Sequence, residues 1–184
     1  MKRRTWLWTG IVAVGAATLL GAASSTAAVA DDVHVQNIVF ERLTGFQEDP
    51  LVFSTPGSAT FAATINDKDQ TINFRLSWKD LPTAVQQSHI HFGGPRQSGG
   101  VSVFLCTNLG NGPAGTQACP AGDATITGTL TPADVIGPAG QGIAAGEFNE
   151  LVRAIRAGVT YVNIHTTERP GGEIRAQING LGDD

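Results

Sequence analysis

The sequence predicts an all-β fold, an antiparallel β-sandwich of about 7–8 strands with one short crossover helix. Three observations support this prediction. Apolar and polar residues alternate over many short segments, and clusters of Gly, Pro, Asn and Asp separate these segments from one another. In addition, a single segment near the C-terminus has the apolar spacing of a helix.

The strand candidates follow one another along the chain with turn signals between them. They are His34–Arg42, Ser58–Ile65, Thr71–Trp78, Gln87–Phe92, Val101–Leu105, Ala124–Leu130, Val159–His165 and Glu173–Ile178. Asn66-Asp67-Lys68-Asp69-Gln70 separates two of them and predicts a hairpin, as does Pro170-Gly171-Gly172 between the last two.

The predicted helix follows the strand candidate that ends at Leu130. Its apolar residues have the spacing i, i+3, i+4 and i+7, and they are Phe148, Leu151, Val152 and Ile155. Glu147 stands near the start, Arg153 and Arg156 stand near the end, and Gly158 comes just after it. These charges complement the helix dipole, and the glycine suits a C-terminal cap.

The first 30 residues have the pattern of a cleavable signal peptide. Lys2, Arg3 and Arg4 precede an uncharged run over Thr5–Leu20, and Ala28-Val29-Ala30 is an A-x-A cleavage pattern. The run is shorter than the ~20 residues that a bilayer span needs, which argues against a membrane anchor. A basic segment often contains a chance Arg pair, so we expect the general secretory route rather than the twin-arginine route.

Cleavage after Ala30 would leave residues 31–184 as a single domain, secreted or periplasmic. Without Lys2, Arg3 and Arg4 the chain has 12 − 3 = 9 basic and 16 acidic residues, a formal charge of −7. Such an acidic chain, without a basic cluster in its sequence, argues against nucleic acid and anionic lipid as partners. A protein or a cell-envelope ligand remains as the expected partner, and no later apolar run predicts a membrane span.

Cys106 and Cys119 are the two cysteines of the chain. In an oxidising compartment two cysteines usually pair, and the glycine-rich segment Thr107–Ala118 between them would gain from a crosslink. The alternative is a thiolate metal site, for which a second pair of cysteines is missing. We therefore predict a disulfide bond.

Histidines occupy one face of the predicted sheet. His89-Ile90-His91 places two imidazoles on the same side of a strand, about 6.5–7 Å apart. His165 ends a later strand, on the side that it shares with Tyr161 and Asn163, and the last strand places Glu173, Arg175 and Gln177 opposite its aliphatic residues. If the aliphatic sides meet in one core, these polar residues form an outward face, open to water or covered by a loop such as the one after Cys106.

Two imidazoles from an H-x-H strand and a third from a neighbouring strand are a frequent set of ligands for zinc or copper. His89, His91 and His165 are the candidate ligands, and Glu173 is a candidate fourth ligand or a hydrogen-bond acceptor behind them. The alternative is a network of hydrogen bonds without a metal. His34 is expected to be incidental, and no common catalytic motif is present, so no catalytic residue is proposed.

These segments also resemble a known family. Ser88-His89-Ile90-His91, Val101–Cys106, Gly158–Thr167 and Pro170–Gln177 resemble the chordin (CHRD) domain, and Leu43-Thr44-Gly45 and Pro56-Gly57 fit its first half. The resemblance extends over Val35–Ile178. It implies an immunoglobulin-like extracellular module. The cysteine-rich modules with which chordin binds growth factors have no counterpart here, so that function is not implied.

A looser likeness connects the H-x-H strand with copper–zinc superoxide dismutase, whose two-metal site needs more histidines and an Asp than this chain supplies. The resulting interpretation is an exported, non-enzymatic binding or envelope module with a histidine-bearing polar face. The alternative is a mononuclear copper or zinc protein, with dismutase-like redox activity among its possible functions, that uses His89, His91 and His165.

Overall fold

The computed structural model describes residues 37–181. The predicted signal peptide, its cleavage site after Ala30, and His34 lie outside this range. The described part contains the strands β1 (Ile38–Leu43), β2 (Ser58–Asn66), β3 (Thr71–Lys79), β4 (Val85–Phe92), β5 (Gly100–Thr107), β6 (Ala124–Leu130), β7 (Thr160–Thr166) and β8 (Ile174–Ile178). All eight overlap the strands that the sequence predicts. None of the helices in this range has the length and apolarity that a bilayer span needs.

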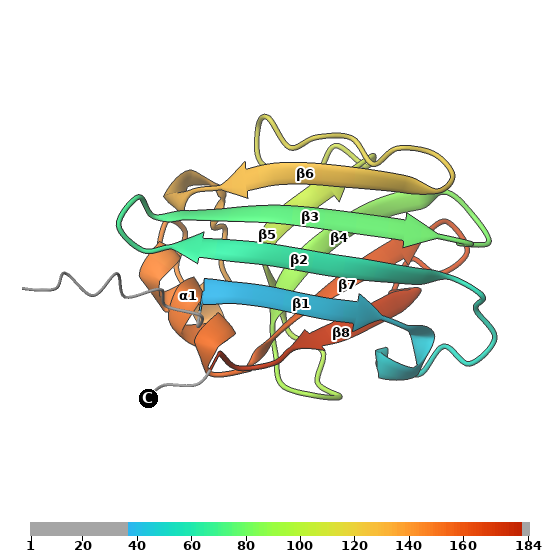
Figure 1. Cartoon of the computed structure of the whole chain (residues 1–184), viewed down its shortest axis with the longest axis horizontal. Helices are drawn as coiled ribbons and strands as arrows, with labels where there is room; N and C mark the ends of the chain where they lie inside the picture. The colour runs from blue at the N-terminus through green and yellow to red at the C-terminus, as the bar shows by residue number, and fades with distance from the viewer. Residues whose placement is uncertain (1–36, 182–184) are drawn as a thin grey trace, which may run out of the picture. The chain divides into compact units, whose positions relative to one another are not determined.

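The strands form two antiparallel four-stranded sheets, with the orders β1-β2-β3-β6 and β5-β4-β7-β8. The sheets stack face to face, with α1 (Phe148–Arg156) at one end (Figure 1). Both sheets turn apolar side chains inward, such as Phe61, Leu76, Val162 and Ile164, and the two sets form one core. The predicted all-β sandwich with one short helix is confirmed.

Helix α1 connects the two sheets, because it lies between β6 and β7 in the chain. All four residues of the predicted apolar stripe are buried, which confirms the helical spacing. At its C-terminus Gly158 has a φ of +69° and donates its N–H to the Ile155 carbonyl, as expected of a glycine cap. Glu147 accepts a hydrogen bond from the Ala144 N–H, rather than from the N–H groups of the first helical turn.

The predicted disulfide joins Cys106 of β5 to Cys119, and both residues are buried. Cys119 precedes β6, so the bond links the edge strand of one sheet to the segment that enters the edge strand of the other. Gln117 supports the same junction, since its Nε2 donates to the carbonyls of Leu105 and Thr127. At the opposite edge Thr44 and Arg175 exchange two backbone hydrogen bonds, which connect β1 to β8.

Candidate metal centre

Strand pairing places the histidines on the outer face of the β5-β4-β7-β8 sheet. His89 stands opposite Asn163 of β7, and His91 stands opposite Tyr161. Gln87 of β4 stands opposite His165. Residues paired in antiparallel strands point to the same side, so all three imidazoles project from one face, while Ile90 points into the core.

The pairing of β4 with β5 has two irregularities at the H-x-H motif, one just before it and one within it. The register shifts between Ser88 and His89 and again between Ile90 and His91. Such bulges change the direction of neighbouring side chains and are frequent beside functional sites. The ring centroids of His89 and His91 are 5.2 Å apart, at an interplanar angle of 79°.

The three imidazoles come together as the sequence predicts. One ligand nitrogen from each of His89, His91 and His165 lies within 4.8 Å of the others. The closest pair is His89 Nδ1 and His165 Nε2, 3.3 Å apart. Two nitrogens bound to one ion at about 2.0–2.1 Å are about 3.3–3.6 Å apart for tetrahedral to trigonal bond angles. This pair already has the spacing of two ligands of a single ion.

Backbone carbonyls determine which ring nitrogens hold protons. His91 Nδ1 is 2.9 Å from the Gly99 carbonyl, and His165 Nδ1 is 2.9 Å from the Pro170 carbonyl. A carbonyl can only accept, so in the neutral rings both Nδ1 atoms carry the proton and both Nε2 atoms keep a lone pair. Histidine ligands of metals are held in the same way, with the second nitrogen donating to a carbonyl or a carboxylate.

The imidazoles are buried, with exposed fractions of 2% for His89, 8% for His91 and 6% for His165. Burial lowers the pKa of all three, to about 2 for His89 and to about 4 for His91. The neighbouring imidazoles lower the pKa of His89 further, because two charged rings would repel each other. The rings are therefore neutral near pH 7, which is the form that binds metal ions.

Connections from the ends of the strands cover this face. The β4–β5 connection supplies the carbonyl of Gly99 to His91 and those of Gly94 and Gln97 to Arg175. The β7–β8 connection supplies the carbonyl of Pro170 to His165. Of the two arrangements expected from the sequence, the covered one is observed. The loop at Cys106 was one example of such a cover, but the carbonyls that meet His91 and His165 come from these other connections.

Tyr161 is a member of the site that the sequence prediction did not select. Its ring stacks on His91 with centroids 4.7 Å apart and planes 4° apart, and the guanidinium carbon of Arg175 is 3.4 Å from its centroid. The ring thus lies between an imidazole and a buried cation. Its hydroxyl accepts a hydrogen bond from the Gly99 N–H. Strand alternation already put Tyr161 on the histidine face, which was the available signal.

The other predicted polar residues lie on or next to this face with different partners. Arg175 and Gln177 bind backbone carbonyls, and Asn163 is buried with its Oδ1 unpaired within the described range. Glu173 is fully buried, and its Oε2 accepts a hydrogen bond from the Thr166 hydroxyl. It is not a member of the histidine group, because its carboxylate meets Thr166 and, at 3.5 Å, Arg169 Nε instead.

Glu48 is a second residue that the sequence prediction missed. It follows a single 3-10 turn, Gly45–Gln47, in the β1–β2 connection, and it is 5% exposed. Burial raises the pKa of its carboxyl to about 7, although the nearby guanidinium of Arg175 lowers it. No alternation marks this irregular connection in the sequence, so nothing there could have placed Glu48 beside the site.

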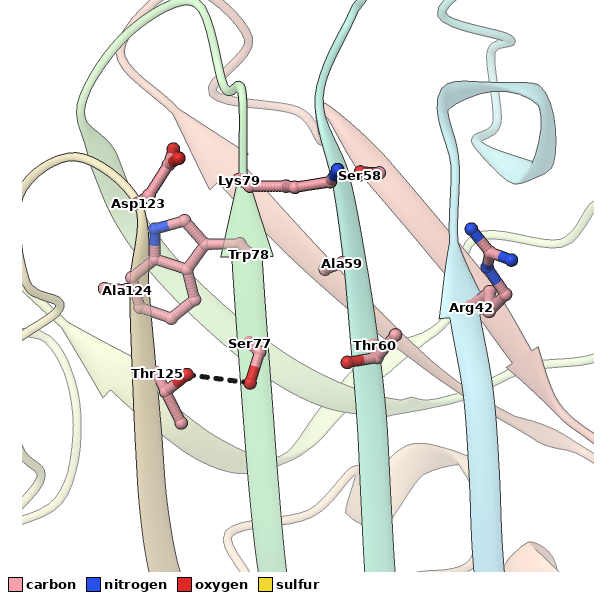
Figure 2. A pocket seen from close by; sticks show the side chains of 10 residues that line it. All are labelled: Arg42, Ser58, Ala59, Thr60, Ser77, Trp78, Lys79, Asp123, Ala124 and Thr125. Atoms are coloured by element: carbon pink, nitrogen blue, oxygen red, sulfur yellow. Dashed lines mark hydrogen bonds between the residues drawn. The ribbon is translucent and has the colours of Figure 1, made fainter.

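A separate hollow of about 500 Å³ lies across the β1-β2-β3-β6 sheet (Figure 2). Arg42 lies on β1 at one side of it, and the Lys79 side chain extends from β3 toward Ser58 of β2. The hydroxyls of Ser77 and Thr125 are 2.8 Å apart. The lining of the hollow contains hydroxyl groups and a few charges, but no histidine or cysteine. Among residues 37–181, the group of side chains that could hold a metal lies on the other sheet.

Fold and site together define an all-β, disulfide-linked sandwich with a buried three-histidine cluster. Residues 40–178 match the family model of the CHRD domain, so the chain belongs to the CHRD-domain family. The resemblance seen in the sequence is confirmed. Comparison with the curated proteins gives no match, and comparison with the solved structures gives none either.

Proposed function

We propose that this CHRD-domain protein is exported and binds one transition-metal ion, copper or zinc, through His89, His91 and His165. The observation that carries the proposal is the state of two buried nitrogens. Nε2 of His91 has no hydrogen-bond partner in the part of the chain that the structure describes, and Nε2 of His165 has only His89 Nδ1, 3.3 Å away. A buried polar atom without a partner costs about 1–3 kcal/mol, a cost that coordination of a metal would remove.

The competing hypothesis, a hydrogen-bond network without a metal, fits these atoms less well. Networks that serve stability alone leave few buried polar atoms unpaired. Here His91 and His165 are each held at Nδ1 by a carbonyl. Among the described residues Nε2 of His91 has no partner, and Nε2 of His165 has only His89 Nδ1. Converging lone pairs are what a cation requires, and imidazole nitrogens suit copper and zinc.

Export is supported by two independent features of the chain. Residues 1–30 have the order of charge, apolar run and small-residue site of a signal peptide. The disulfide between Cys106 and Cys119 is of the kind that persists in oxidising compartments. We assign no reaction to the site. Three histidines are too few for a two-metal dismutase centre.

The proposal is tested by the metal content of the mature chain, residues 31–184, purified without an affinity tag. The protein is incubated with Cu²⁺ or Zn²⁺, passed over a desalting column and analysed by mass spectrometry of the elements. We expect close to one equivalent in the wild type, and less than about a tenth in His89→Ala and in His165→Ala, because two imidazoles hold these ions far more weakly than three.

His34→Ala is the matched control, because His34 is the remaining histidine of the four in the chain. It should retain the wild-type equivalent. A wild type that holds less than about a tenth of an equivalent of either ion contradicts the proposal. So does a metal content that falls equally in His34→Ala and His89→Ala, because that result would indicate unspecific binding to histidines.

A further inference from the structure

We propose that the three-histidine site is selective for the monovalent ion Cu⁺ over Zn²⁺ and Cu²⁺. This inference rests on the proposed function and adds the identity and charge of the ion. Three features of the described residues carry it: the neutrality of the ligand set, a buried cation beside it, and the exclusion of water.

The ligand set has no negative charge of its own. The group that could hold a metal consists of His89, His91 and His165, with no carboxylate or thiolate among the described residues of the group. The Nδ1 atoms of His91 and His165 are backed by neutral backbone carbonyls, not by carboxylates. Divalent zinc in proteins is commonly compensated by thiolate or carboxylate ligands, or by a carboxylate behind a histidine. Nothing comparable compensates a second positive charge here.

A permanent positive charge lies close to the site. Arg175 is 2% exposed, and its guanidinium donates to the Gly94 and Gln97 carbonyls and to Gln177 Oε1, all of them neutral acceptors. One aromatic ring, that of Tyr161, separates the guanidinium from His91. Because its repulsion acts on each charge of a bound ion, a divalent ion is disfavoured twice as much as a monovalent one.

Other charges near this face offset the guanidinium only in part. Glu48 is the acidic group that interacts with Arg175 most strongly, with Asp49 after it. Glu173 and Arg169 approach each other to 3.5 Å, so their charges largely cancel. Of these charges, that of Arg175 is separated from His91 by a single aromatic ring. The potential at the cluster is therefore neutral to positive.

Burial adds to the same preference. The cost of transferring an ion from water to a protein interior grows with the square of its charge, so a divalent ion loses more than a monovalent one. Zn²⁺ held by three histidines takes a fourth ligand, usually water. The imidazoles here are 2–8% exposed, and the Phe104 ring packs against that of His89 in a T-shaped contact with centroids 4.4 Å apart. Cu⁺ is satisfied by three nitrogens and needs no water.

The test compares the dissociation constants of the three ions for the untagged mature protein. Cu⁺, kept reduced by ascorbate without oxygen, is titrated against bicinchoninate, Zn²⁺ against a fluorescent zinc chelator, and Cu²⁺ against glycine. We expect the constant for Cu⁺ to be lower than both others by at least about tenfold. If the protein binds one equivalent of metal through His89 but the dissociation constants differ by less than tenfold, the selectivity is overturned and the proposed function stays intact. Absence of binding by all three ions overturns both.

Variants of Arg175 isolate the contribution of its charge. Arg175→Gln should lower the ratio of the Zn²⁺ to the Cu⁺ constant by about tenfold, and Arg175→Lys should keep the ratio, because the lysine retains the charge. Arg153→Gln, at an exposed position on α1, is the control and should change nothing. A uniform weakening of both ions in both Arg175 variants would indicate a merely structural role and contradict the electrostatic argument. If Arg175→Gln does not fold, the wild-type ratio still decides the proposal.

Discussion

The outer faces of the two sheets have similar strand patterns and opposite environments. On the β1-β2-β3-β6 sheet the outward residues stay in contact with water, and β3 alternates strictly between buried and less buried positions. On the β5-β4-β7-β8 sheet every residue of β7 is buried, including the outward-facing Tyr161, Asn163 and His165. One face carries hydroxyls and exposed cations, and the other encloses three neutral imidazoles and an arginine.

The connections between strands account for this difference. β2 and β3 are joined by the short turn Asp67–Gln70, which cannot reach over its own sheet. The long β1–β2 connection leaves that sheet and reaches the other one, where Gln47 Oε1 accepts a hydrogen bond from the Gln177 N–H and Glu48 lies against Gly172. The alternation of apolar and polar residues therefore determines the side to which a residue points. The path of the connections determines whether that side is excluded from water.

The largest expected effect is the pH dependence that the covered face imposes on stability. His91 and His89 have pKa values lowered to about 4 and 2 in the folded protein, against 6.5 in the unfolded chain. Below pH 6.5 the unfolded chain binds more protons, so the free energy of unfolding falls as the pH falls. Glu48, with its pKa raised to about 7, opposes this trend between about pH 7 and 4.5.

The net loss between about pH 7 and pH 4 should be about 4 kcal/mol, since the two histidines lose about 3 kcal/mol each and Glu48 regains part of the sum. Urea unfolding of the metal-free protein at several pH values measures it. His91→Gln should show a shallower slope than the wild type. A free energy of unfolding that stays constant over this range would contradict the burial of neutral imidazoles.

A matched pair of arginines tests the two faces directly. Arg175→Met removes the donors to the carbonyls of Gly94 and Gln97 in the covering β4–β5 connection. It should lower the free energy of unfolding by about 3 kcal/mol. Arg42→Met, on the exposed face, should change it by no more than about 0.5 kcal/mol. Urea unfolding curves give both values. Similar losses in the two variants would show that the faces do not differ as described.

Much of the fold follows from the sequence because it depends on local patterns. Alternation located the strands, the i, i+3, i+4, i+7 spacing located α1, and the H-x-H motif with His165 gave the three imidazoles that the structure brings together. These features depend only on the spacing of apolar and polar residues along the chain and on the pairing of neighbouring strands. The loop closed by Cys106 and Cys119 could also be predicted, because the chain holds a single pair of cysteines.

The cover of the site could not be predicted in the same way. Its contacts are single backbone carbonyls, such as those of Gly99 and Pro170, in connections that have no periodic pattern. The position of Glu48 depends on a long-range contact with the β7–β8 connection, more than 100 residues further along the chain. The hydrogen-bond partner of Glu173, Thr166, could not be predicted either, because alternation gives only the side of the strand on which Glu173 lies.

A smaller effect than that of Arg175→Met is expected at the contact that holds the cover in place. Gly172 has a φ of +135°, and a Cβ atom there would lie 2.7 Å from the carboxylate of Glu48, so Gly172→Ala must both strain the backbone and displace Glu48. We expect a loss of about 2 kcal/mol in the free energy of unfolding.

Gly171→Ala is the matched control, because a Cβ atom at the neighbouring position meets nothing within 4 Å. Denaturant unfolding of both variants should show the loss in Gly172→Ala alone. Equal behaviour of the two would mean that Glu48 does not pack against this turn, and the covered face would then depend on the β4–β5 connection without it.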